Sequence, residues 1–330
     1  MSGVTHRRIG ADDAEQRLDR WLRKVFPAAS QGLIQKLLRT GQIRVDGKRA
    51  EASLRLVAGQ EVRLPPQLTG APPAAAPKGP RPPSGEEAEL LRSRVLHSDR
   101  RVIVLDKPAG LAVQGGSKQN RPLDHLLAAL VPDGEETPRL VHRLDRDTSG
   151  ALVLARGAAA ARALTAAFRE RKARKLYLAL VEGKLDPLAG RIDKPLAKGG
   201  EAGRERMGVD EDEGEEAVSL YAVIATTNNG RISYVALSPL TGRTHQLRAH
   251  MAAIGHPVVG DGKYGARDPG QLMLHASEIA VPHPDDETTL RVEAPLPESF
   301  TAKLKRYGLV GEKIEQRLAV AIEKLIVRGA

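Results

Sequence analysis

The chain has 330 residues with a net charge of +10, 41% hydrophobic residues, 28% charged residues and no cysteine. Its length allows two domains with separate cores, and the absence of cysteine excludes disulfides, thiol nucleophiles and cysteine-ligated zinc. No run approaches the roughly 18 apolar residues of a membrane span, and no apolar signal core follows Met1, so we expect a cytoplasmic protein without membrane contact. The basic balance favours a polyanionic partner, most often nucleic acid, although it can also serve solubility alone.

The first 64 residues predict a small basic α+β domain. Residues 18–26 have one apolar helical face, and Ser30 can cap a second helix. Asp46–Gly47 is a hairpin signal, and EVRL (61–64) predicts a further strand. This segment holds 13 Lys+Arg against 7 Asp+Glu, so it carries 6 of the 10 excess positive charges.

This order of two helices, a turn and a small sheet resembles the alpha-L, ribosomal S-four-type RNA-binding domain over about residues 14–64. The resemblance implies an RNA-binding face that includes Lys36, Arg39, Arg44 and Lys48. Each of these side chains taken singly could equally be an ordinary solvated charge.

The segment after this domain is rich in proline, with eight prolines between residues 65 and 85. Such a composition cannot pack a core, so we expect an extended linker over 65–89. A larger body follows over 90–308. Residues 309–330 contain an amphipathic helix that could pack on the body or on a partner.

The body predicts a mixed α and β fold. Expected strands are two short ones within 101–113 and one each at 151–155, 176–181 and 232–238, and expected helices are 158–174 and 244–255. Because strands and helices do not alternate regularly, an α+β sheet domain is favoured over a doubly wound one.

Five segments of the body carry chemically useful side chains. They are LDKPAGLAVQGGS (105–117), HRLDRDTSG (142–150), RKLYLALV (174–181), TGRTHQLRAHMAAIGHPVVGDGKYG (241–265) and LMLHA (272–276). In this order they resemble the RluA/RluC/RluD family of ribosomal RNA pseudouridine synthases, over about residues 95–305. The GGS element and the RNA-binding head resemble the RluC branch.

The resemblance implies a pseudouridine synthase catalytic domain with a mixed, mainly antiparallel sheet. It implies isomerisation of uridines in large-subunit (23S) ribosomal RNA, the expected partner, by a chain that we expect to be a monomer. The isomerisation needs no redox change and no added atoms, so we expect no cofactor and no metal. Which uridines are modified stays open, as does transfer RNA as an alternative target.

The resemblance assigns three catalytic residues. Asp145 matches the catalytic aspartate, which would act on a flipped-out uridine at either carbon six of the base or the ribose anomeric carbon. Arg243 matches the arginine that pairs with this aspartate and keeps it ionised, with Arg248 as a rival that could bind phosphate instead. Tyr177 matches a tyrosine that packs on the base and could assist removal of the ring proton, although a half-buried strand tyrosine is the structural alternative.

Further residues have supporting roles by resemblance. Arg143 could fill the space that the flipped base leaves, because its planar guanidinium can stand in for a base. Leu274 would form the pocket floor or be plain core, and His142 would brace the loop beside the substrate. The spacing of His245, His250, His256 and His275 matches no zinc motif.

Two features and one alternative function remain. The acidic run DEDEGEE (210–216) is unusual on an RNA-binding enzyme, and we expect an exposed loop turned away from RNA. The family often has basic residues there, so Glu215 and Glu216 depart from the pattern. A non-catalytic RNA-binding or ribosome-assembly factor is the alternative function, but such a module would not need Asp145, Tyr177 and Arg243. An aspartic protease would need a second aspartate turn, which the sequence does not contain.

Overall fold

The computed structural model divides the chain into two compact units, Met1–Arg81 and Pro82–Ala330. The residues that it describes are 4–10, 13–69, 83–115, 121–132, 134–200, 206–267 and 269–329. No helix in these ranges is long and apolar enough to cross a lipid bilayer.

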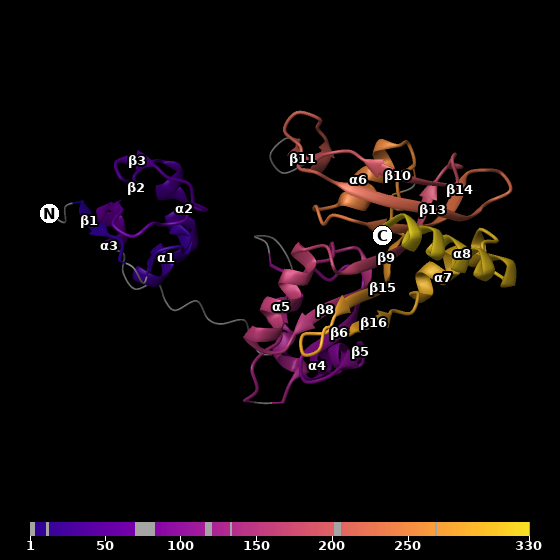
Figure 1. Ribbon diagram of the computed structural model, residues 1–330, viewed down its shortest axis with the longest axis horizontal. Helices are drawn as coiled ribbons and strands as arrows, with labels where there is room; N and C mark the ends of the chain where they lie inside the picture. Colours follow the sequence, from indigo (N-terminus) through magenta and orange to yellow (C-terminus); the bar gives the residue numbers. More distant parts are fainter. Residues whose placement is uncertain are drawn as a thin grey trace. The chain divides into compact units, whose positions relative to one another are not determined.

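The first unit is a four-stranded sheet packed against two helices (Figure 1). Its elements are β1 (Thr5–Arg8), α1 (Leu18–Val25), α2 (Gln31–Arg39), β2 (Arg44–Val45), β3 (Lys48–Arg49) and β4 (Glu61–Leu64), with strand order β1-β4-β2-β3. Leu18, Trp21 and Leu22 of α1 are fully buried with Ile34 of α2. This single apolar cluster holds the unit together.

The local signals of this unit are confirmed. The Ser30 hydroxyl accepts a hydrogen bond from the Leu33 N–H and so caps α2. Asp46 and Gly47 both have positive φ and join β2 to β3. β1 was not expected, because all four of its side chains are exposed and leave no alternating pattern in the sequence.

The expected linker, residues 65–89, contains helices at both ends. α3 (Pro66–Thr69) follows β4, and α4 (Gly85–Arg92) opens the second unit. The Ser84 hydroxyl accepts from the Glu87 N–H, and the Glu87 carboxylate accepts from the Ser84 N–H at 2.8 Å. Because Ser and Glu at this spacing form a capping box, the prediction of a linker up to residue 89 is wrong. Residues 70–82 lie outside the described ranges.

The second unit is built on a ten-stranded sheet that is mainly antiparallel, as expected. Along its main path the strand order is β10-β13-β14-β9-β15-β8-β6-β5, with β16 paired to β15 and β7 to β8. Its strands are β5 (Val95–Ser98), β6 (Val102–Lys107), β7 (Arg139–Leu140), β8 (Ser149–Ala155), β9 (Arg174–Glu182), β10 (Ala189–Asp193), β13 (Val218–Thr226), β14 (Ile232–Pro239), β15 (Leu274–Pro282) and β16 (Thr289–Glu293). β11 (Leu196–Gly199) and β12 (Arg206–Val209) form a separate ribbon. In the main sheet, β15 and β8 pair in parallel.

Helices cover both faces of this sheet. On the β8 half, α5 (Gly157–Arg169) packs on one face, while α4 and two 3-10 helices (Leu123–His125 and Leu127–Leu130) pack on the other. On the β9 half, α6 (Gln246–Ala253) lies on one face, and α7 (Glu298–Arg306) and α8 (Glu312–Gly329) lie on the opposite one. The central strands are therefore buried on both sides, which explains their continuous apolar runs.

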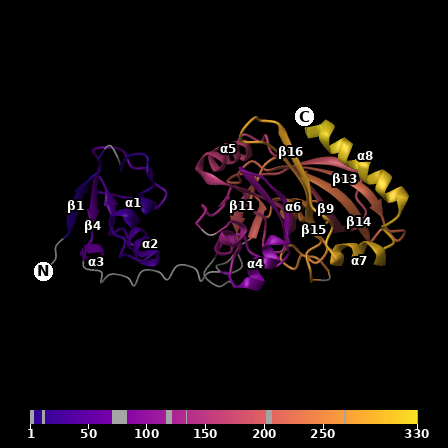
Figure 2. The same ribbon diagram turned by 90° about the horizontal axis from the view of Figure 1, so that it is seen from below.

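The C-terminal amphipathic helix, expected over 309–330, is α8. Figures 1 and 2 show it running along β13 and β14. Ala321 and Leu325 are buried in the cluster that these strands form. Of the two alternatives for this helix, the structure thus shows packing on the body.

Two element predictions need correction. α5 ends at Arg169 and not at residue 174, because Arg171 adopts a left-handed backbone conformation that the helix cannot continue. The run 101–113 forms the strand β6 and then a loop in place of the expected second strand. The Lys107 ammonium donates to the carbonyls of Leu111 in this loop and of Arg146 in the Asp145 loop, and so holds the two loops together.

Candidate active site

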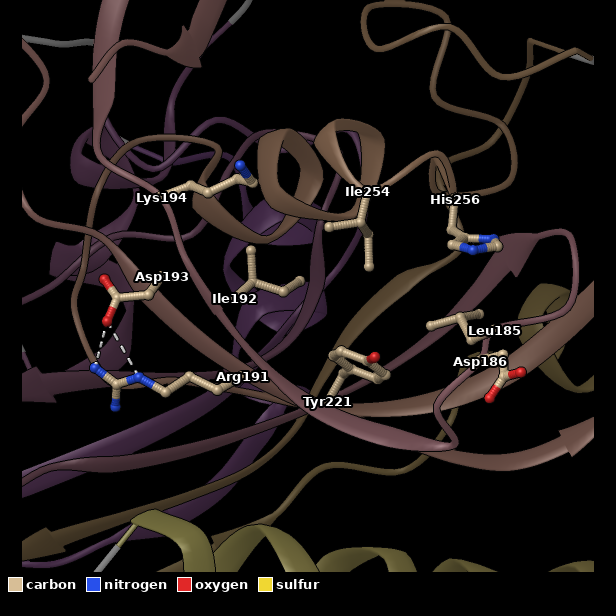
Figure 3. Close-up of a pocket in the computed structure, with 9 residues that line it drawn as sticks. All are labelled: Leu185, Asp186, Arg191, Ile192, Asp193, Lys194, Tyr221, Ile254 and His256. Carbon is tan, nitrogen blue, oxygen red and sulfur yellow. Dashed lines mark hydrogen bonds and ion pairs between the residues drawn. The ribbon is translucent and has the colours of Figure 1, made fainter. Parts of the chain in front are cut away.

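One hollow of the second unit lies at the β10 edge of the sheet (Figure 3). It has a volume of about 420 Å³ and is lined by charged and apolar side chains. Arg191 and Asp193 at its rim pair with each other at 2.7 Å. None of the predicted site residues lines this hollow, although His256, one of the four histidines that match no zinc motif, does.

A larger cleft, of about 1040 Å³, contains every site residue predicted for the body. These residues come from four separate segments of the chain. They are His142, Arg143, Asp145, Tyr177, Arg243, Arg248 and Leu274. The fold therefore brings these residues of distant segments together in one cleft, while their catalytic and binding roles stay predictions.

The Asp145 loop is fixed by the parallel contact between β8 and β15. The loop follows β7 and ends where Ser149 and Gly150 enter β8, opposite His275 and Ala276. Gly150 has φ +110°, and a Cβ there would lie 2.1 Å from the Ala276 carbonyl oxygen. The Ser149 hydroxyl and His275 Nδ1 are 2.9 Å apart. Only glycine permits this close approach of the two backbones. The contact therefore fixes the end of the Asp145 loop against β15.

A buried lysine holds the other side of the loop. Lys107, at the end of β6, is 1% exposed, and its ammonium donates to the carbonyls of Pro108, Leu111 and Arg146, each at 2.9 Å. Burial lowers the pKa of Lys107 to about 8, although the nearby carboxylates, including Asp145, oppose this shift. The Arg146 carbonyl directly follows Asp145, so Lys107 positions the residue predicted to react.

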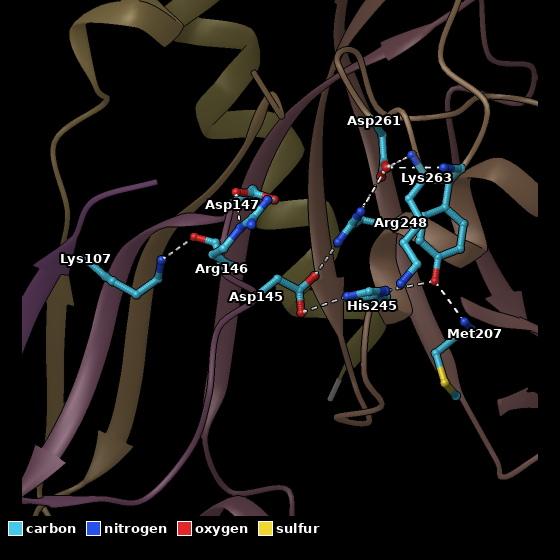
Figure 4. A network of polar contacts seen from close by, with 10 residues as sticks. Lys107, Asp145, Arg146, Asp147, Met207, His245, Arg248, Asp261 and Lys263 are labelled. Carbon is cyan, nitrogen blue, oxygen red and sulfur yellow. Dashed lines mark hydrogen bonds and ion pairs between the residues drawn. The ribbon is translucent and has the colours of Figure 1, made fainter. Parts of the chain in front are cut away.

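Arg248 is the arginine that pairs with Asp145 (Figure 4). Its Nη1 donates to Asp145 Oδ2 at 3.3 Å, while its Nε and Nη2 donate to the two oxygens of Asp261 at 2.7 and 2.9 Å. The Arg248 and Asp261 side chains are 8% and 1% exposed. Burial works to lower the pKa of Arg248, but the hydrogen bonds and charges of Asp261 and Asp145 raise it overall. A fixed positive charge therefore faces the Asp145 carboxylate, whose side chain is 21% exposed.

The expected pairing of Arg243 with Asp145 is wrong. Arg243 lies on the loop before α6, where its backbone N–H donates to Gln246 Oε1 at 3.0 Å. Its guanidinium instead pairs with the Glu215 carboxylate and donates to the Glu216 carbonyl at 3.0 Å. Arg248 replaces it because position 248 lies on the buried face of α6, while position 243 lies at the cleft rim.

The expectation that the acidic run 210–216 turns away from RNA holds only in part, because its last two residues reach the cleft. Its first part forms an exposed turn between β12 and β13. Glu216 pairs with Arg171 at 2.7 Å and Glu215 pairs with Arg243. Both of these arginines line the cleft, so the last two acidic residues lie at its rim.

Tyr177 and Leu274 form part of the cleft wall. Leu274, at the start of β15, is buried, and Tyr177 on β9 is half-buried against the same apolar cluster. Burial and the negative charge of Asp145 raise the pKa of Tyr177. This shift disfavours a phenolate, so Tyr177 offers a neutral hydroxyl and an aromatic face rather than an anionic base.

His142 and Arg143 differ in their surroundings. His142 stacks on Phe168 with ring centroids 4.4 Å apart, and its Nε2 accepts from the Val153 N–H at 2.9 Å. Burial and the charge of Lys175 lower its pKa to about 3, so the ring is neutral and braces the loop. Arg143 is exposed on the cleft wall.

Sequence reasoning missed a set of polar residues behind Asp145. His245 Nε2 lies 4.0 Å from Asp145 Oδ1, and its Nδ1 is 3.0 Å from the Tyr264 hydroxyl, which accepts from the Met207 N–H. This arrangement favours a neutral His245 that carries its proton on Nε2, towards Asp145 (Figure 4). Tyr264, like Asp261, lies in GDGKYG, and its clustering with His245 depends on folding rather than on sequence spacing.

The four basic residues predicted for the head are exposed. Lys36 and Arg39 lie on α2, Arg44 on β2 and Lys48 on β3. The Arg44 guanidinium donates to the carbonyls of Gly41 and Gly47 at 3.2 Å, so it also ties two turns together. An RNA-binding role for these four residues stays a prediction.

Comparison with known proteins identifies the family of the chain. Residues 101–253 match the family model described as RNA pseudouridylate synthase, and residues 16–62 match the S4 domain. The ribosomal large subunit pseudouridine synthase C of Escherichia coli (strain K12) is 35% identical over 309 residues, which are 90% of this chain and 95% of that protein. The chain belongs to the RNA pseudouridine synthase family. This pseudouridine synthase is therefore an isomerase with a leading S4 domain.

Other relatives are similar in extent. The Vibrio cholerae protein of the same name is 35% identical over 87% of this synthase and 92% of its own length. Among solved structures, human RNA Pseudouridylate Synthase Domain Containing 4 has a TM-score of 0.58 and 28% identity, covering 67% of this chain and 95% of its own. Human RNA Pseudouridylate Synthase Domain Containing 1 has a TM-score of 0.51 and 27% identity, covering 70% of this chain and 99% of its own.

Proposed function

We propose that this synthase isomerises specific uridines of large-subunit ribosomal RNA in the cytoplasm, with Asp145 as the nucleophile. The names of its curated relatives support this substrate. The observation that carries the proposal is the Asp145 carboxylate held opposite the buried Arg248 inside the cleft. An ionised, oriented carboxylate is what nucleophilic attack on a sugar or base carbon requires.

The reaction conserves all atoms. The bond between the ribose and the base nitrogen breaks, the base turns, and a carbon–carbon bond forms while the ring carbon gives up its proton and the freed nitrogen gains one. Asp145 stabilises the separated base or sugar as a covalent adduct. Tyr177 packs against the base, and its neutral hydroxyl can pass on the ring proton. Leu274 supports the base from the pocket floor.

The RNA must present a single nucleotide to this cleft. The exposed Arg143 guanidinium replaces the flipped base in the RNA stack, and His142 keeps the loop in place. The S4 domain adds affinity through the phosphate contacts of Lys36, Arg39, Arg44 and Lys48. We take the synthase to act as a monomer without a cofactor or metal.

The test is a pseudouridine map of large-subunit ribosomal RNA by carbodiimide-stop primer extension. A strain lacking the protein is complemented with wild type, Asp145→Asn or Asp147→Asn. Asp147 is the matched control, because it is a partly exposed carboxylate two residues away that pairs with Arg146. We expect specific stops to disappear in the deletion and to return with wild type and Asp147→Asn only. Stops that persist without the protein would overturn the ribosomal substrate.

A further inference from the structure

Two arginines of the cleft rim are already engaged by carboxylates. Arg171 lies in the turn between α5 and β9, and its two Nη atoms donate to both oxygens of Glu216 at 3.2 and 2.7 Å. Arg243, from the loop before α6, pairs with Glu215. The two arginines come from distant segments, and two consecutive acidic residues bring them to one place.

The acidic pair has a fixed backbone and free side chains. The Glu215 N–H and carbonyl both bond to Leu196, which is fully buried. The side chains of Glu215 and Glu216 are nevertheless 67% and 57% exposed. The backbone therefore keeps both residues at the cleft rim, while their ion pairs stay open to water and to other anions.

Such exposed pairs are weak and exchangeable. An exposed arginine–carboxylate pair stabilises a protein only slightly, because solvent screens it and side-chain entropy opposes it. The fork-shaped, bidentate contact of Arg171 with Glu216 is also the geometry in which arginine binds a phosphate. A phosphodiester can thus take the place of each carboxylate at little cost.

We propose that Arg171 and Arg243 form a phosphodiester-binding site for the RNA backbone, which Glu215 and Glu216 occupy as competing anions in the free enzyme. The inference rests on the proposed function in one respect, namely that RNA enters this cleft. RNA must exchange two carboxylates for two phosphates as it enters. The acidic pair therefore lowers the affinity of the rim for any polyanion and favours RNA that also makes the remaining contacts of the cleft.

The test is RNA affinity across a salt series, measured by filter binding of the full chain to a large-subunit ribosomal RNA transcript. The double variant Glu215→Gln/Glu216→Gln keeps the side-chain shapes and removes the two charges. Its matched control is Asp212→Asn/Glu213→Gln, which removes two charges from the same acidic run. Among the described residues, no ion pair is found for the Asp212 or Glu213 side chain.

We expect the Glu215/Glu216 variant to bind about three- to thirty-fold more tightly at low salt, with a steeper salt dependence. The control should change affinity by no more than about twofold. In an Arg171→Gln background, Glu216→Gln should no longer increase affinity, because its partner is absent. Equal gains from the two double variants, or no gain from the first, would overturn the competing-anion site.

This outcome is separable from the proposed function. Pseudouridine formed by wild type in the same transcript is measured in parallel. If no pseudouridine forms, the proposed ribosomal substrate fails, whereas the comparison of the two double variants still decides whether Glu215 and Glu216 compete with RNA.

Discussion

The floor of the cleft, formed around Asp145 and Arg248, and its rim, formed by Arg171, Arg243 and their glutamates, both use arginine. They use it in opposite ways. Arg248 on the floor is 8% exposed and is bound by two carboxylates, of which Asp261 is fully enclosed. Arg243 on the rim, five residues earlier, is 35% exposed and is paired with an exposed glutamate. The floor fixes one charge permanently beside Asp145, whereas the rim holds charges that can change partners. Burial, and not the motif around each arginine, decides which of them pairs with Asp145.

The largest effect is expected at Arg248. Arg248→Gln should lower activity by about 10³-fold or more, since Asp145 loses the charge that orients it. It should also lower the free energy of unfolding by about 3–5 kcal/mol, because the buried Asp261 carboxylate loses its opposite charge and keeps only the backbone N–H groups of Lys263 and Tyr264. Single-turnover tritium release from labelled RNA and calorimetric unfolding measure the two effects. Arg267→Gln is the control, as its side chain is 87% exposed.

A second change separates the two roles of Arg248. Adding Asp261→Asn to Arg248→Gln removes the unpaired buried carboxylate, so part of the lost stability should return while activity stays low. If activity returned together with stability, Arg248 would serve the fold alone, and the contrast between floor and rim would break down.

The rigidity of the floor is tested next at Gly150. Gly150→Ala should destabilise the protein by about 2–5 kcal/mol, because the new Cβ meets the Ala276 carbonyl and φ is unfavourable. Gly110→Ala is the matched control. Its φ is also positive, at +86°, but its Cβ would have no atom within 4 Å, so we expect only about 1 kcal/mol. Thermal unfolding of both variants measures the difference, and equal losses would show that conformation rather than the strand contact matters.

Acid should destabilise the Asp145 loop, which the neutral His142 ring braces. The pKa of His142 is lowered by burial to about 3, so the folded state binds fewer protons than the unfolded state below pH 6.5. The stabilisation by neutral His142 is complete above pH 6.5 and declines as the pH falls towards 3. From pH 6.5 to 5 the loss amounts to at most about 2 kcal/mol.

His142→Gln should therefore show a flatter decline of unfolding free energy between pH 6.5 and 5, measured by near-ultraviolet circular dichroism. His125→Gln, at an exposed histidine, should keep the slope of the wild type. A wild-type slope in His142→Gln would mean that the ring is protonated as readily in the folded as in the unfolded chain.

The smallest effect is expected at Arg243. Arg243→Gln should change the unfolding free energy by no more than about 0.5 kcal/mol and raise KM roughly three- to ten-fold, with kcat within about twofold. Steady-state kinetics on the ribosomal transcript separates KM from kcat. A fall in kcat as large as that of Arg248→Gln would place Arg243 on the floor after all.

The sequence predicted well wherever local chemistry decides the structure. The cap at Ser30 and the Asp46–Gly47 turn are examples. It failed where burial decides. Arg243 and Arg248 share one short motif, and their partners Glu215 and Asp261 lie 28 and 13 residues away.

The three hydrogen bonds that the buried Lys107 ammonium donates could not be predicted from the sequence either. Lysine is usually exposed, so its sequence position next to Pro108 does not reveal a buried ammonium. The strand β1 is a further case, because exposed side chains on every position give no periodic signal. Both features depend on which parts of the chain the fold brings together.

The two units differ in their aromatic residues. Trp21 is the chain's single tryptophan and is fully buried in the first unit, whereas all five tyrosines, at 177, 221, 234, 264 and 307, lie in the second. Tryptophan emission therefore reports on the S4 unit alone, and tyrosine signals report on the catalytic unit alone. The native chain thus carries a separate optical reporter for each unit, so the unfolding of one can be followed beside that of the other in a single sample and without any added label.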